Sequence, residues 1–307
     1  VSEKTTSGYQ QDFRNIGMQL SDRLNHKEWV EVYKKLVYWE LELETSSDES
    51  MREILAMQKH EANALYSKFI EANYVNWLNG KDKSPPILSH TLLKSKLFPN
   101  LEKDSCTFLV VIDNIRYDQW KMIQPGISEY LRVNSEELFF SILPTATQYA
   151  RNALFAGLMP SEIQKLHPAL WVSDDDDQGK NLHEEELLMS NLKRSAKELK
   201  TSYHKITNHA SGKKLSENLN NLMQNNLNVI VYNFVDMLSH ARTEMEVIRE
   251  LVDDEKAYRS ITVSWFENSP LHDILKQVAA KKARLVITTD HGTVNVTEPS
   301  KIVGDRN

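Results

Sequence analysis

Several apolar segments of the sequence end on side chains that commonly bind metal ions. Asp113 follows "FLVVI", Asp236 follows "IVYNFV", and Asp290 with His291 follows "LVITT". Carboxylates gathered at one edge of a sheet repel each other strongly unless cations compensate their charge. Carboxylate and neutral imidazole groups are ligands suited to Zn²⁺, with Mn²⁺ a weaker alternative. These strand ends therefore predict a metal site.

A second histidine belongs to the same pattern. The segment "DMLSH" places His240 four residues after Asp236. One helical turn or a tight loop would bring both side chains to the same side of the backbone. We expect this pair to hold a metal ion as well. For Asp113 the competing interpretation is a helix N-cap directly after a strand.

The segment "LPTATQYARNALFAGLMP" contains a candidate nucleophile. A strand is expected to end at Pro144 and a helix to begin near Gln148, so a threonine hydroxyl would lie where the helix dipole and backbone N–H groups favour an anion. Metal coordination would activate such a hydroxyl for attack on phosphorus. Thr145 and Thr147 are the two candidates.

Other polar residues have weaker assignments. Arg151 falls one turn after the second threonine and is a candidate for binding phosphate oxygens, although a solvated arginine is an alternative. Asn114 is a further candidate substrate contact. Residues 174–185, "DDDDQGKNLHEE", approximate the spacing of a Ca²⁺ loop, but a solvated acidic loop is the favoured interpretation.

The elements that must position these residues fall into two regions. From about Gln11 to Leu78, apolar residues recur at three- and four-residue spacing, which predicts two or three antiparallel helices. The segment "NGKDKSPPILSH" has the composition of a linker. We expect a helical bundle over residues 1–85 and a second domain over residues 86–307.

The second region alternates short apolar segments with helical ones, which predicts a parallel, doubly wound α/β sheet. Ligands of such sheets collect at the carboxyl ends of the strands. The expected strands are Cys106–Asn114, Glu137–Pro144, Leu227–Asp236 and Ala283–His291. The expected helices are Arg151–Leu158, His183–Leu199, Leu215–Gln224 and Pro270–Lys281.

Composition excludes some functional classes. The chain has 307 residues, 40% of them hydrophobic, and a net charge of -6 with a pI near 6.0. That balance argues against a polybasic surface for nucleic acid or membranes. Cys106 is the single cysteine, so an intramolecular disulfide is excluded. The sequence contains no recognisable signal peptide and no apolar run of transmembrane length, and we expect a cytoplasmic protein.

The order of Asp113, Thr147, "DMLSH" and "TTDHG" resembles that of the alkaline phosphatase superfamily. Within it, "VIDNIRYDQW" and "PTATQYARNALFAGLMPSEI" resemble the PglZ domain. The preceding helical region is similar to that of PorX-type response regulators, which regulate type IX secretion. The resemblance implies an alkaline-phosphatase-like sheet preceded by a helical bundle, with a receiver domain upstream of both.

The same resemblance implies two zinc sites. The implied ligands are Asp113, Asp290 and His291 for one ion and Asp236 and His240 for the other. The superfamily takes a further ligand of the second ion from a later histidine, and no histidine follows His291 here. We therefore expect the natural protein to continue past Asn307 and to supply that ligand there.

The implied activity is zinc-dependent phosphodiester hydrolysis, acting on nucleotides or short oligonucleotides. The segment "PTAT", which begins at Pro144, resembles the "P-T-x-T" turn of nucleotide pyrophosphatase/phosphodiesterase relatives. This resemblance favours Thr147 over Thr145 as nucleophile. The implied partners are a sensor histidine kinase, a sigma factor or other transcription factor, and a second copy of the activated protein. The alternatives are a phosphorylation-controlled module that docks a transcription factor or nucleotide without turnover, and a phosphotransferase.

Overall fold

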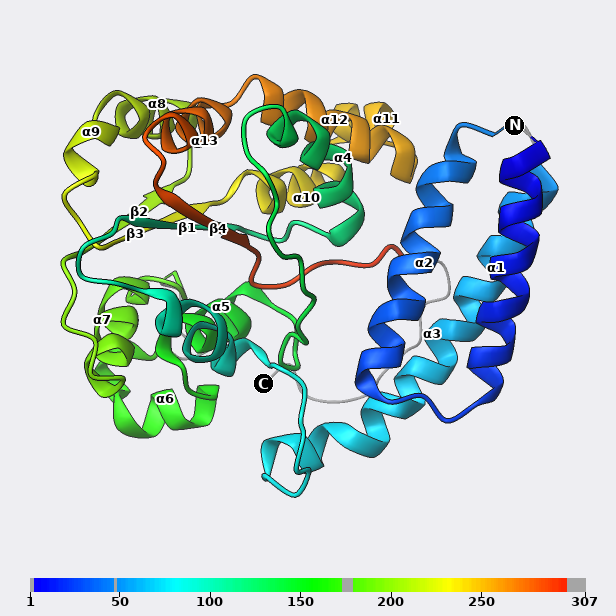
Figure 1. Cartoon of the computed structure of the whole chain (residues 1–307), viewed down its shortest axis with the longest axis horizontal. Helices are drawn as coiled ribbons and strands as arrows, with labels where there is room; N and C mark the ends of the chain where they lie inside the picture. Colours follow the sequence, from blue (N-terminus) through cyan, green and yellow to red (C-terminus); the bar gives the residue numbers. More distant parts are fainter. Residues whose placement is uncertain (1–2, 47–48, 173–178, 297–307) are drawn as a thin grey trace. The chain divides into compact units, whose positions relative to one another are not determined.

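The computed structural model describes residues 3–46, 49–172 and 179–296. The chain divides into two compact units, Val1–Pro86 and Ile87–Asn307. In its described part the first unit is helical. The second is a parallel sheet with helices on both faces (Figure 1).

The first unit consists of long helices, as the apolar spacing predicts. They are α1 (Glu3–Ser21), α2 (His26–Glu44) and α3 (Glu49–Leu78). Asn25 caps α2 by accepting the backbone N–H groups of Lys27 and Glu28, and the Glu28 carboxylate accepts the N–H of Asn25 in return. The helices share an apolar core that includes Ile16, Leu36, Trp39, Leu43 and Leu55.

The sheet of the second unit is entirely parallel, in the order β2-β3-β1-β4. Its strands are β1 (Thr107–Ile112), β2 (Thr201–Ile206), β3 (Leu227–Tyr232) and β4 (Arg284–Thr288). Every residue of the central strands β1 and β3 is buried. Near-continuous apolar strands are what a sheet covered on both faces requires.

Successive residues of β1 face the two helical layers alternately. Phe108, Val110 and Ile112 pack in one apolar cluster, and Leu109 and Val111 pack in the other. The first cluster includes residues of α4 (Tyr117–Ser128), α8 (His209–Glu217), α9 (Leu219–Leu222), α12 (Glu255–Glu267) and α13 (Pro270–Ala280).

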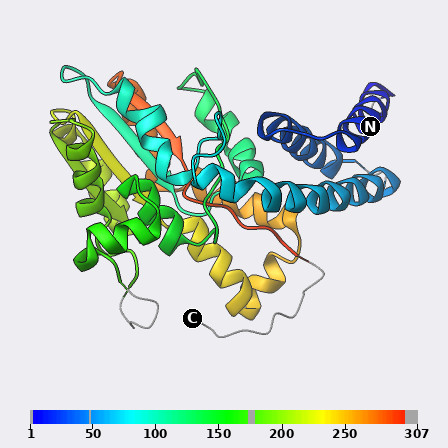
Figure 2. The same cartoon turned by 90° about the horizontal axis from the view of Figure 1, so that it is seen from below.

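The opposite layer includes three helices that Figure 2 shows in green. They are α5 (Thr147–Ala156), α6 (Pro160–Leu166) and α7 (Glu184–Arg194). Two further helices, α10 (Phe234–Glu244) and α11 (Glu246–Leu251), follow the end of β3. The doubly wound arrangement predicted from the sequence is therefore confirmed.

Two details of the predicted sheet are wrong. The segment 137–144 is no sheet strand: Phe140 forms an isolated bridge to Leu88, and Ile142 donates its N–H to the Ser89 hydroxyl. Apart from that bridge, the segment does not pair with a strand in the described part of the chain. An apolar run alone does not distinguish a sheet strand from an irregular buried segment. Residues 201–206, "TSYHKI", instead form the edge strand β2, whose polar side chains conceal it from a search for apolar runs.

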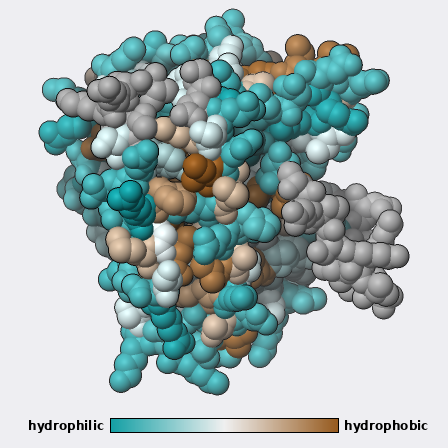
Figure 3. Space-filling model, turned by 90° about the vertical axis from the view of Figure 1, so that its right-hand side faces the viewer, coloured by the Kyte–Doolittle hydropathy of each residue, from teal (hydrophilic) through white to brown (hydrophobic). Residues whose placement is uncertain are grey.

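Several large hydrophobic side chains are exposed on the surface, among them Met18, Met57, Val247 and Leu251. On the face drawn in Figure 3, the brown patches are small and separated by hydrophilic teal side chains. Within the described ranges, no helix is both long enough and apolar enough to cross a membrane.

Candidate metal centre

The pairing of β1 with β4 brings two of the expected ligands together. Val111 lies opposite Thr288, so Asp113 and Asp290, each two residues farther along, come level at the carboxyl edge of the sheet. The backbone N–H of Asn114 donates to Asp290 Oδ1 at 3.1 Å. Carboxylates that are distant in the sequence therefore meet because the strands are parallel and in this register.

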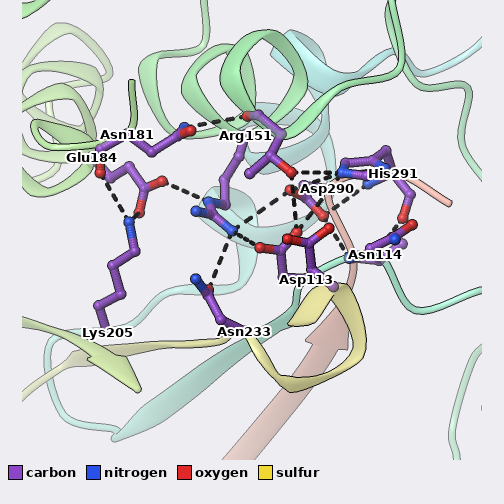
Figure 4. Close-up of polar contacts among 12 residues, drawn as sticks. Asp113, Asn114, Arg151, Asn181, Glu184, Lys205, Asn233, Asp290 and His291 are labelled. Atoms are coloured by element: carbon purple, nitrogen blue, oxygen red, sulfur yellow. Dashed lines mark hydrogen bonds and ion pairs between the residues drawn. The ribbon is translucent and has the colours of Figure 1, made fainter. Parts of the chain in front are cut away.

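Asp113, Asp290 and His291 form a buried group whose ligand atoms all lie within 4.8 Å of one another (Figure 4). His291 Nε2 is 3.8 Å from Asp113 Oδ1 and also 3.8 Å from Asp290 Oδ2. Two oxygen donors and one nitrogen donor at such separations are suited to a transition metal such as Zn²⁺.

Arg151 compensates the negative charges in this group only in part: its Nη1 contacts Asp113 Oδ2 and lies 3.8 Å from Asp290 Oδ2. Burial raises the pKa of Asp290 well above its ordinary value, and the neighbouring charge of Asp113 raises it further. Burial lowers the pKa of His291, although Asp113 opposes that shift. The imidazole is therefore biased toward the neutral form that binds metals.

Some polar atoms here lack partners. Asp290 Oδ2, His291 Nδ1 and Asn114 Oδ1 are buried and have no hydrogen-bond partner among the described residues. A buried carboxylate oxygen without a hydrogen bond is costly, although the charge of Arg151 offsets part of that cost for Asp290 Oδ2. A divalent cation would supply the missing partner of Asp290 Oδ2, so the residues fit a bound metal ion.

Thr147 lies beside this group as the first residue of α5. Its Oγ1 is 2.9 Å from His291 Nε2 and 3.4 Å from Asp113 Oδ1. Thr145 is exposed to solvent. The geometry thus brings the hydroxyl of Thr147 to the candidate ligands.

Arg151 is buried, with 2% of its surface exposed, so it is not the solvated arginine considered above. Its Nη1 lies 2.5 Å from Asp113 Oδ2, and its Nε donates to Glu184 Oε1 at 2.6 Å. A direct contact between Arg151 and a phosphate group stays a prediction. Asn114 is equally buried and adopts a left-handed backbone conformation, with φ of 61°. Its contact with substrate also stays a prediction.

Comparison with known proteins identifies this region. Residues 92–307 match the BREX system PglZ alkaline phosphatase-like domain. The chain belongs to the PglZ family. Residues 1–78 match the PorX response regulator linker domain. No curated protein matches the chain. The resemblance seen in the sequence motifs is therefore confirmed for both regions.

The remaining expected ligands of the PglZ domain lie on α10. Asp236 Oδ2 is 3.6 Å from His240 Nε2, so the four-residue spacing places both side chains on one face of a helix. Burial and the charge of Asp113 both raise the pKa of Asp236 above its ordinary value. The His240 side chain is 66% exposed. In the described part of the chain, this pair does not join the group around Asp290.

The PglZ domain also contains polar residues at this site that the motifs did not indicate. Glu184 forms an ion pair with Arg151, and Lys205 Nζ lies 3.6 Å from the Glu184 carboxylate. Asn181 Nδ2 donates to the Thr147 carbonyl at 3.2 Å. Asn233 Oδ1 is 3.5 Å from Arg151 Nη1. The predicted strand Leu227–Asp236 included Asn233 in its interior, but β3 ends at Tyr232, so Asn233 directly follows the strand. Glu184 is one of several consecutive acids at the start of a helix, and no local signal distinguishes it.

The acidic segment considered as a calcium loop is only partly described. Residues 174–178 lie outside the described part of the chain. The segment's last two residues, Glu184 and Glu185, begin α7. Glu184 is buried against Arg151, so its carboxylate is already engaged.

Proposed function

We propose that the PglZ domain is a zinc-dependent phosphoric ester hydrolase, specifically a phosphodiesterase of nucleotides or short oligonucleotides. One observation carries the proposal: the Thr147 hydroxyl lies next to a buried group of two carboxylates and an imidazole. A hydroxyl beside metal ligands is the arrangement needed for nucleophilic attack on phosphorus.

Each candidate ligand has a place in this proposal. The ligands proposed for the first ion are Asp113, Asp290 and His291, and those proposed for the second are Asp236 and His240. When bound, zinc would supply positive charge that lowers the pKa of a nearby hydroxyl and stabilises negative charge on phosphoryl oxygens.

The chain's own groups then carry the reaction. The Thr147 hydroxyl loses its proton as Oγ1 attacks phosphorus in line and forms a phosphothreonine ester. The bond from phosphorus to the leaving oxygen breaks, and the leaving group takes up a proton and departs as an alcohol. Asp113 Oδ1, 3.4 Å away, orients the hydroxyl before attack. The ester forms at the first residue of α5, where the helix dipole favours negative charge. Water hydrolyses the ester and restores Thr147. We propose Asn114 and Arg151 as the residues that face the substrate.

The match to a linker domain supports a signalling role for this activity. Because residues 1–78 match a response regulator linker domain, we propose that hydrolysis is the output of a two-component system. A receiver domain phosphorylated by a sensor histidine kinase would then control the PglZ domain. A transcription factor and a second copy of the chain are the further partners that we propose, and the cytoplasm is the location that fits them.

Metal analysis combined with a phosphodiester assay tests the proposal. We expect purified protein to contain zinc and to hydrolyse bis(p-nitrophenyl) phosphate and short oligonucleotides, with loss of turnover on chelation and recovery on addition of zinc. Absence of any transition metal, together with absence of turnover, would contradict the proposal and favour the binding-module alternative.

A further inference from the structure

Glu184 is a buried acid with several positively charged or hydrogen-donating neighbours. It is the first residue of α7, and only 1% of its surface is exposed. Its Oε1 accepts a hydrogen bond from Arg151 Nε at 2.6 Å. Its Oε2 accepts from the Tyr203 hydroxyl and lies 3.6 Å from Lys205 Nζ. Figure 4 shows Arg151 reaching from Glu184 to Asp113.

The contacts of Arg151 hold its planar guanidinium at two points. Nε is fixed by Glu184 and Nη1 by Asp113 Oδ2 at 2.5 Å. A planar group held at two points cannot rotate about its long axis. Because Asp113 Oδ2 is occupied, its other oxygen, Oδ1, faces Thr147 and His291, at 3.4 Å and 3.8 Å.

A second path leads from Glu184 to the backbone of the candidate nucleophile. Lys205 Nζ, beside the Glu184 carboxylate, donates to the Asn181 carbonyl at 2.9 Å. Asn181 Nδ2 in turn donates to the Thr147 carbonyl at 3.2 Å. Both paths end at the same site, one at a carboxylate ligand and the other at the start of α5.

A purely structural role does not account well for this arrangement. Buried ion pairs contribute little net stability, because desolvation offsets the attraction between the charges. The Glu184 carboxylate also adds negative charge to a region that already contains Asp113 and Asp290. What the arrangement does supply is a fixed orientation of the Asp113 carboxylate.

We propose that Glu184 is a positioning residue of the metal centre: through Arg151 it determines which oxygen of Asp113 is offered to the metal ion. The proposal rests on the proposed function, because it requires a metal at the Asp113 site. Groups that orient metal ligands typically affect affinity or activity by about 10- to 100-fold when they are replaced.

The test compares Glu184→Gln with the matched variant Glu185→Gln, which removes the same charge from the exposed neighbour on the same helix. Zinc affinity is measured on the full chain by competition with a chromophoric chelator, and folding is checked by circular dichroism. We expect Glu184→Gln to raise the zinc Kd about tenfold or more, and Glu185→Gln to leave it within about twofold. With saturating zinc, kcat should fall while KM changes little.

Coupling to Arg151 separates positioning from stabilisation. In an Arg151→Lys background, the added Glu184→Gln change should cost little further zinc affinity, because the two-point contact is already lost. Additive losses would overturn the inference, as would a folded Glu184→Gln protein with wild-type zinc affinity. If Glu184→Gln does not fold, Glu184→Asp provides the same comparison, because its shorter carboxylate retains the charge but not the reach. A wild-type chain that binds no zinc would instead overturn the proposed function, and this inference with it.

Discussion

The hydroxyl of Thr147 lies 2.9 Å from Nε2 of His291, although 144 residues separate the two in the sequence. One residue begins the helix α5, and the other follows the strand β4. Their contact joins the candidate nucleophile to the candidate metal ligands. Because Thr145 is exposed and Thr147 makes this contact, substitution of each threonine should have a different effect.

Thr147→Ala should lower phosphodiester hydrolysis by about 10³-fold or more, because it removes the hydroxyl that lies beside the candidate ligands and would form the covalent ester. Zinc content should stay near that of the wild type, since the three clustered ligands remain. Steady-state kinetics and elemental analysis provide the measurement. Thr145→Ala is the matched control and should retain most activity. Turnover that survives Thr147→Ala but not Thr145→Ala would reverse the assignment.

Removal of metal should lower the thermal stability of the wild type, because buried carboxylates lose their compensating charge and a bound ligand stabilises the native state. Asp290→Asn removes one of those charges. We therefore expect the variant to be less stable than the wild type with zinc present, but at least as stable after chelation. Thermal unfolding in zinc and in chelator measures both. An equal loss of stability under the two conditions would argue against a metal at Asp290.

The pair on α10 should contribute to a second metal site. Asp236→Asn and His240→Gln are each expected to lower the bound zinc from about two equivalents toward one, because each change removes a ligand. Glu244→Gln is the control, since the Glu244 Oε1 lies 3.7 Å from His240 Nδ1 yet is exposed. Equilibrium dialysis gives the stoichiometry. One equivalent in the wild type, unchanged in both variants, would exclude this second site.

The segment after Asp113 is held by a buried charge network with a predictable pH dependence. Burial alone would raise the pKa of Asp118, but the charges and hydrogen bonds of Arg116 and Arg259 together lower it below its ordinary value. An acid whose pKa is lowered by folding adds stability above its unfolded pKa, about 3.9, and this stability is lost as the pH falls through the folded pKa.

Asp118→Asn should therefore destabilise the protein by about 3 kcal/mol at pH 7, as expected for a broken buried ion pair. The difference from the wild type should shrink below about pH 3.9. Urea denaturation at several pH values measures the free energy of unfolding. Asp104→Asn, at an exposed position, should have little effect at any pH. A loss that does not depend on pH would show that packing, not charge, explains the effect.

Gly157 caps the C-terminal end of α5, the helix that begins with Thr147. Its backbone has a φ of 63°, which residues with a side chain rarely adopt. A Cβ there would lie 2.7 Å from the side chain of Asn191, whose Nδ2 donates to the Phe155 carbonyl. Gly157→Ala should destabilise the domain by more than about 1 kcal/mol, through strain and the displaced amide.

Gly126→Ala is the matched control for that prediction. Gly126 lies within α4 and has no atom within 4 Å of an added Cβ. The change should stabilise the domain by roughly 0.5–1 kcal/mol, because alanine favours helix. Denaturant titration compares the two variants. Equal effects at Gly157 and Gly126 would mean that neither the backbone conformation nor Asn191 restricts the helix end.

The sequence by itself determined the kinds of element and the chemistry at their ends. Three- and four-residue apolar spacing predicted the helices of the first unit, and apolar runs predicted β1, β3 and β4. Asp113, Asp290 and His291 were detectable because each follows such a run. These signals are local, since periodicity and residue type are written in adjacent positions.

Only the tertiary structure decided which distant residues meet. The register of β1 against β4 places Asp113 beside Asp290, and packing of α5 against α7 directs Arg151 to Glu184, 33 residues away. No local pattern encodes a strand register or the neighbour of a buried charge. The polar edge strand β2, and with it Lys205, was missed for the same reason: its place in the sheet depends on pairing with β3, not on apolar residues of its own.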